Sequence, residues 1–254
     1  MLYPHLHLLV SGGNTQLLYL QSWTDFKTIG STLDDAAGEC FDKTARMTGL
    51  PYPGGVYLSK IAGLMDQNYQ NFPVSMKQSG DFNFSFSGLK TAVRYYLEKQ
   101  ILSNGHKFEL EKRLSQLQIE FLATHTLLEI QQFRDLEIQN STQIYQQRPI
   151  LSTELANDAT NILNYAVLAI VKEVCISVQS AIVAALLFKV CIAAQDLEIA
   201  TVGLSGGVSA NPLLRSKLSE LFGDKLLLAP KNLTGDNAVM IGLAGILDWK
   251  YNTK

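Results

Sequence analysis

Two short apolar runs, each followed by Ser-Gly-Gly, most constrain how this 254-residue chain can fold. Leu6–Val10 precede Ser11–Gly13, and Ile199–Leu204 precede Ser205–Gly207. Short runs of strand-forming residues that stop at a glycine pair predict strands ending in tight turns. Paired glycines also let backbone N–H groups come close to a phosphate. The pattern fits either ordinary turns or nucleotide-binding loops, and local sequence leaves both open.

The remaining chain alternates between strand and helix signals. Asp34 is the expected N-cap of a helix that Gly49 ends. The strand–glycine turn–helix pattern predicts an α/β domain with a mixed sheet and packed helices. Further strands are expected at 15–20 and 225–229, a new unit begins at 29–31, and a loop is expected at 72–87. Further helices are expected at 59–65, 89–97, 162–195, 211–221 and 238–249.

Composition separates residues 101–160 from their flanks. This stretch is rich in Gln, Asn, Glu and Leu, and glycine is absent after Gly105. An apolar stripe at helical spacing runs through its first part. We therefore predict a weakly tied helical insertion at 101–160, with residues 1–100 and 161–254 forming one lobe.

Charge and hydropathy exclude several classes of protein. The chain is 47% apolar and 17% charged, which excludes a disordered polymer. Its net charge of −2 provides no global field for RNA, so any RNA contact is local or made with a partner. Three cysteines without a CxxC pair indicate a reducing compartment. The longest uninterrupted apolar run in the hydrophobic 162–194 stretch, Ala181–Phe188, is too short for a bilayer, so we expect a core helix and no membrane span.

Three carboxylates and two histidines are the titratable clusters. Asp35, Glu39 and Asp42 share one helical face at spacings of four and three, where like charges repel. This face is either solvated or supplies a carboxylate for ligand hydroxyls. His5 and His7 share a face of a strand, but no third ligand stands near them in sequence, so a metal role is disfavoured.

Six motifs in order resemble those of the TsaD family, the tRNA N6-adenosine threonylcarbamoyltransferases. The resemblance covers roughly residues 2–97 and 165–248. It implies the ASKHA fold of actin, hexokinase and the Hsp70 ATPase domain, of which this chain would form essentially the second lobe. The matching segments read LVSGGNTQL from Leu9, LDDAAGECFDKT from Leu33, YPGG from Tyr52, FSFSGLKT from Phe84, GGVSAN from Gly206 and DNA from Asp236.

The resemblance also implies site residues and a cofactor. Asp42 would bind the nucleotide ribose, and Asp236 would be a metal ligand. The metal would be a divalent ion, iron by resemblance with zinc as the alternative. The other positions implied to bind substrate or nucleotide are Leu9, Val10, Ser11, Gly12, Gly13, Gly55 and Asn211.

The implied reaction transfers a threonylcarbamoyl group from threonylcarbamoyl-AMP to N6 of adenosine 37 in tRNAs that read codons beginning with A. The implied partners are tRNA and, in bacteria, TsaB- and TsaE-like proteins, in the cytoplasm. Family members carry a His-x-x-x-His metal motif in a lobe before the LVSGG segment. That motif is absent here, and Asn14 replaces the usual histidine. We therefore expect an incomplete metal site and a separate N-terminal lobe.

The sequence leaves one alternative function open and disfavours two others. The alternative is a non-catalytic TsaD-like fragment or pseudoenzyme that keeps nucleotide-binding or partner surfaces. An ASKHA sugar or acetate kinase is disfavoured because no Asp-containing DxG loop opens the chain. A metalloprotease is rejected because the sequence has no HExxH helix.

Overall fold

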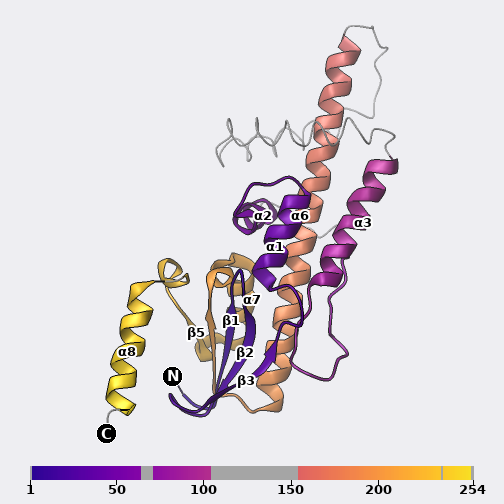
Figure 1. Ribbon diagram of the computed structural model, residues 1–254. Coiled ribbons are helices and arrows are strands. Elements are labelled where there is room, and N and C mark those ends of the chain that lie inside the picture. The colour runs from indigo at the N-terminus through magenta and orange to yellow at the C-terminus, as the bar shows by residue number, and fades with distance from the viewer. Residues whose placement is uncertain (1, 64–70, 104–153, 236, 253–254) are drawn as a thin grey trace. The chain divides into compact units, whose positions relative to one another are not determined.

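A five-stranded mixed sheet organises the fold in the computed structural model, which describes residues 2–63, 71–103, 154–235 and 237–252 (Figure 1). The strand order is β3-β2-β1-β4-β5. β1 pairs antiparallel with β2 and β2 with β3, whereas β1–β4 and β4–β5 are parallel. The strands span β1 (His5–Val10), β2 (Thr15–Leu20), β3 (Phe26–Ser31), β4 (Thr201–Ser205) and β5 (Leu226–Leu228).

The two faces of the central strand β1 differ in the chemistry of their side chains. Leu6, Leu8 and Val10 are completely buried on one face, as the period-two alternation of a strand requires. His5 and His7 lie on the opposite face with Leu9. The apolar face therefore forms the core of the sheet, and the histidine face carries polar groups.

Six α-helices are described, together with three short 3-10 turns. The helices predicted outside the 101–160 stretch are found, although α2 begins at Gly54 and not at Ser59. The strand β3 was not predicted. The helices are α1 (Ala37–Met47), α2 (Gly54–Ala62), α3 (Ser87–Ser103), α6 (Glu154–Asp196), α7 (Pro212–Phe222) and α8 (Ala238–Asn252), and the 3-10 turns are η1 (Gly207–Ala210), η2 (Gly223–Lys225) and η3 (Lys231–Leu233).

Helix α6 contains the hydrophobic stretch that the sequence assigned to a core helix. Ala169–Asp196 is long and apolar enough to cross a membrane, yet 67% of its most apolar window is buried within the protein. Lys189, itself buried, donates from Nζ to Asp81 O at 2.6 Å and to Ser79 Oγ at 2.8 Å. A buried helix that also ties down a loop fits a core element.

The chain divides into two compact units. The sheet unit comprises Met1–Lys43, Phe72–Thr91 and Ser180–Lys254, and the helical unit comprises Thr44–Asn71 and Ala92–Gln179. The predicted insertion at 101–160 lies mostly outside the described residues. Helices α3 and α6 extend into its two ends. The division at residues 100 and 160 stays a prediction.

Candidate nucleotide site

The two Ser-Gly-Gly loops follow neighbouring parallel strands and leave the same edge of the sheet. Leu9 in β1 pairs with Ser205 in β4. Gly206 has a φ of 90°, and a Cβ there would lie 2.2 Å from Val10 O. Only glycine permits this backbone and this approach. The sequence therefore brings the second loop directly against the end of β1, where the first loop begins.

The first loop packs onto the start of helix α1. Ser11 N donates to Asn14 O at 2.8 Å, and Asn14 N donates to Ser11 Oγ at 3.0 Å, which closes a tight turn. Gly38 N donates to Ser11 O at 3.1 Å, and a Cβ on Gly38 would lie 2.5 Å from that oxygen. Asp42 follows Gly38 by four residues, so it lies one turn further along the same face of α1. The predicted ribose ligand is thus on the helix face that meets the loop.

Three glycines in these loops have no packing reason to be glycine. A Cβ on Gly12, Gly13 or Gly207 would meet nothing within 4 Å, and none of the three has a left-handed φ. All three are exposed. The space beside these exposed glycines is open, which leaves room for a phosphate to approach the loop backbone. The geometry favours loops that receive a ligand over loops that are only turns.

Asn211, a predicted binding residue, is the N-cap of helix α7. Its Oδ1 accepts a hydrogen bond from Leu214 N at 3.0 Å, and Pro212 occupies the first turn. Asn211 is buried, at 8% exposed. The sequence pattern Asn-Pro before a helix explains this cap. The side chain therefore fixes the helix that follows the second glycine loop.

The predicted site residues do not all lie in one described unit. Leu9–Gly13, Asp42 and Asn211 belong to the sheet unit. Gly55 lies in the first turn of α2, in the helical unit, so its place relative to the others is not assigned. Asp236 lies outside the described residues.

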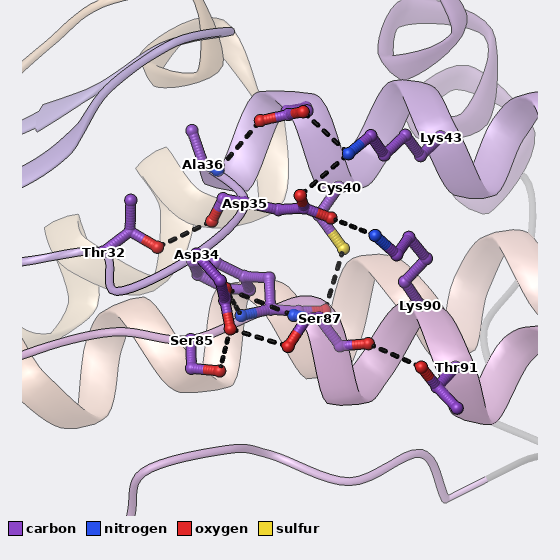
Figure 2. A network of polar contacts seen from close by, with 12 residues as sticks. Thr32, Asp34, Asp35, Ala36, Cys40, Lys43, Ser85, Ser87, Lys90 and Thr91 are labelled. Carbon is purple, nitrogen blue, oxygen red and sulfur yellow. Dashed lines mark hydrogen bonds and ion pairs between the residues drawn. The ribbon is translucent and has the colours of Figure 1, made fainter.

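Asp34 is not the N-cap of α1, which corrects the prediction. The helix begins at Ala37, and the Asp34 carboxylate instead accepts hydrogen bonds from Phe86 N at 2.7 Å and Ser87 N at 3.3 Å (Figure 2). The Ser85 hydroxyl donates to it at 2.5 Å and the Ser87 hydroxyl at 2.7 Å. Partial burial favours the neutral acid, but these four donors lower the pKa of Asp34 below its usual value. Asp34 thus joins the LDDAAGE segment to the start of α3.

Asp35 lies between two lysines (Figure 2). Lys43 Nζ and Lys90 Nζ each approach one of its carboxylate oxygens at 2.8 Å, and Lys43 also pairs with Glu39 at 2.7 Å. Burial raises the pKa of Asp35 and the two lysines lower it, with a net decrease. Asp35 precedes α1, so the prediction that it shares a helical face with Glu39 and Asp42 is wrong, and Lys43 bridges Asp35 to Glu39. Lys43 could have been found from its spacing to Glu39, whereas Lys90 has no local signal.

The described residues do not form a metal site. Among them, no group of three or more His, Cys, Asp and Glu side chains is placed to hold a metal ion. Burial raises the pKa of Cys40 and of Cys175 to about 12, which disfavours thiolate ligands. The ring nitrogens of His5 and His7 bond to each other and to hydroxyl groups. The part of the chain that the structure describes does not fit the metal implied by the resemblance.

Comparison with known proteins identifies the family. The family model for TsaD, described as tRNA N6-adenosine threonylcarbamoyltransferase, matches residues 2–243. Proteins of that name from Thermosipho africanus and Anaeromyxobacter dehalogenans are 35% and 32% identical to the chain over 251 and 247 residues, in each case 96% of this chain. The same stretches are 57% and 55% of those relatives, so the chain spans little more than half their length. By its motifs, its mixed α/β fold and this match, the chain belongs to the TsaD family.

Proposed function

We propose that this chain supplies the adenylate-binding part of a tRNA N6-adenosine threonylcarbamoyltransferase. One observation carries the proposal: Gly206 and Gly38 bring both glycine loops and the Asp42 face of α1 to one edge of the sheet. Open backbone positions at Gly12, Gly13 and Gly207 would hold the phosphate of threonylcarbamoyl-AMP. Asp42 would accept hydrogen bonds from ribose hydroxyls.

The chemistry is an acyl transfer. N6 of the tRNA adenosine attacks the threonylcarbamoyl carbonyl carbon, a C–N bond forms, and the C–O bond to the phosphate breaks. AMP leaves with the electron pair, and N6 loses a proton. An exocyclic adenine amine is a weak nucleophile, so positioning and charge stabilisation must supply most of the rate. The loops contribute by holding the leaving phosphate, on which negative charge increases.

The metal, partners and location belong to the same proposal. Asp236 is proposed as one ligand of a divalent ion, with iron preferred and zinc the alternative, but one carboxylate gives an ion no fixed geometry. No step is therefore assigned to the metal. The substrate would be tRNA, met with TsaB- and TsaE-like partners in a bacterial cytoplasm. The other metal ligands would come from a His-x-x-x-His motif like that of the family.

Calorimetric titration with AMP tests the site. Asp42→Asn should weaken AMP binding about 5- to 100-fold, the loss of hydrogen bonds to a charged acceptor. Asp224→Asn, in the exposed turn η2, is the matched control and should bind like the parent chain. Equal affinity of the Asp42 variant and the parent would remove Asp42 from the site.

A non-catalytic role is the second candidate. In this role the chain would keep the nucleotide-binding loops or partner surfaces without catalysing the transfer. Such a chain would bind AMP normally but give no tRNA modification even when the remaining parts of the enzyme are supplied.

A further inference from the structure

Four side chains form a continuous hydrogen-bonded chain across the histidine face of β1 and β4. Thr201 Oγ1 donates to Leu2 O at 2.6 Å and lies 2.8 Å from His5 Nδ1. His5 Nε2 lies 3.4 Å from His7 Nδ1, and His7 Nε2 lies 2.7 Å from Ser205 Oγ. The chain thus ends at Ser205, the first residue of the second glycine loop.

Each hydrogen bond in this chain has only one direction available. A carbonyl oxygen only accepts, so the single hydroxyl proton of Thr201 is donated to Leu2 O. The Thr201 oxygen must therefore accept a hydrogen bond from His5 Nδ1–H. A neutral imidazole has one N–H, so His5 Nε2 accepts from His7 Nδ1–H, and His7 Nε2 then accepts. The Ser205 hydroxyl must therefore donate to His7.

This direction requires both rings to be neutral. Burial, followed by the neighbouring His7, lowers the pKa of His5 to about 4. Burial also lowers the pKa of His7. At neutral pH each ring therefore carries a single proton, and both should be Nδ1–H tautomers.

Gly203 makes room for the two rings. It lies in β4 opposite His7, and a Cβ there would be 2.4 Å from His7 Nδ1 and 2.7 Å from His5 Nε2. The φ of Gly203 is not left-handed, so space and not backbone conformation requires glycine. The histidine pair and Gly203 therefore form one packed arrangement, to which the proposed function assigns no role.

We propose that Thr201, His5 and His7 are positioning residues that hold Ser205 as a hydrogen-bond acceptor for an O–H or N–H group of the bound adenylate. The identity of the ligand rests on the proposed function. The Ser205 proton is committed to His7, so the free lone pairs of Oγ can only accept. Phosphate oxygens also only accept at neutral pH, so they would repel Ser205. The glycine N–H groups would then bind the phosphate, and Ser205 would accept a hydrogen bond from an O–H or N–H group elsewhere on the ligand.

Ser205 and His7 also have the spacing of a nucleophile and its base. The environment argues against that role. Burial makes His7 a weak base, and the group behind it is a neutral imidazole, where a carboxylate would stabilise the imidazolium. An acyl-Ser205 adduct trapped with threonylcarbamoyl-AMP and found by mass spectrometry would overturn the positioning role.

Nitrogen NMR of the full 254-residue chain tests the direction of the hydrogen bonds without any ligand. Variants His106→Gln and His125→Gln together leave only the His5 and His7 ring signals among the four histidines. At pH 7.5 both rings should show a protonated Nδ1 and a bare Nε2. Thr201→Val removes the anchor and should let the Nε2–H form appear. A His7 Nε2–H or an imidazolium in the parent chain would overturn the proposal.

Calorimetry with AMP and with adenosine tests what Ser205 recognises. Ser205→Ala should weaken both ligands by a similar factor, about tenfold for one hydrogen bond. Ser216→Ala, on the exposed side of α7, is the control and should change neither. A loss confined to AMP would mean that Ser205 donates to phosphate, and no loss for either ligand would remove it from the site. If the parent chain binds neither AMP nor adenosine, both the adenylate site and the recognition role of Ser205 are refuted. The NMR test of the hydrogen-bond direction between Thr201 and Ser205 does not depend on that result.

Discussion

At the scale of single residues, three glycines within one five-residue stretch are required for different reasons or for none. Gly203 is required by the space that two histidine rings fill, and Gly206 by a φ of 90° and the approach to Val10. At Gly207 neither the space nor the backbone conformation requires glycine, because an added Cβ would point into open space. The three positions should therefore differ sharply in their tolerance of a methyl group.

Gly203→Ala should lower the free energy of unfolding by about 1–3 kcal/mol, because the added carbon overlaps His7 Nδ1 in a buried strand. Denaturant titration measures this loss. Gly207→Ala is the matched control and should change the stability by less than about 0.5 kcal/mol. A loss for Gly203→Ala as small as that expected for Gly207→Ala would show that the histidine rings move aside at no cost.

His5 makes stability depend on pH. Its pKa falls from the usual 6.5 to about 4 on folding, so between these values the unfolded chain binds more protons. The free energy of unfolding should therefore fall by about 2–3 kcal/mol as pH drops from 7 to 4. Urea titrations across this window measure the slope. The His5→Gln variant should lose most of this pH dependence of stability and keep only the part due to His7. An unchanged slope in the variant would show that other groups cause the pH dependence.

At the scale of elements, helix α3 depends on a carboxylate from a distant segment. Asp34 lies 52 residues before Phe86, whose N–H it binds, and its other partners are the adjacent Ser85 and Ser87. This contact does for α3 what a local N-cap does for other helices. The LDDAAGE and FSFSGLKT motifs therefore stabilise each other.

Asp34→Ala should cost about 1–2 kcal/mol of stability, the usual effect of losing a cap together with side-chain hydrogen bonds. Asp34→Asn keeps an acceptor and should cost less. Glu220→Ala, which removes an exposed pair with Lys217, is the control and should be nearly neutral. Thermal unfolding ranks the three variants, and a neutral Asp34→Ala would show that α3 starts without its cap.

The same elements show how far sequence reasoning reaches. β1, β2 and β4 were predicted because their apolar residues follow the strand pattern and end at turn residues. β3 was missed because Gly30 is its only buried residue, and the strand is held by β2 and by Asn83 and Phe84. The glycine loops were visible as local patterns. The direction of the histidine chain was not, because Thr201 anchors it from 196 residues away.

At the scale of the whole molecule, binding and turnover make different demands. The two glycine loops lie within one compact unit, and Gly206 packs the second loop against the end of β1. The chain nevertheless spans 57% of the Thermosipho relative, and helix α8 exposes several large apolar side chains. These are Val239, Met240, Ile241, Leu243, Ile246 and Trp249. Cooperative thermal unfolding is therefore the test of folding that should precede any assay of binding or turnover.

The 254-residue chain should bind AMP yet fail to transfer a threonylcarbamoyl group to tRNA by itself. Transfer needs two substrates held in register and charge stabilised at the reacting carbonyl, and the described residues hold no metal group that could do this. The assay incubates unmodified tRNA with threonylcarbamoyl-AMP and TsaB- and TsaE-like partners, then measures modified adenosine by mass spectrometry. Adding the remaining N-terminal part of a relative in trans should give turnover, and the same mixture with Asp236→Ala should not. Turnover by the chain without that addition would contradict the prediction and would mean that the chain itself supplies the other metal ligands, with His5 and His7 the first residues to test.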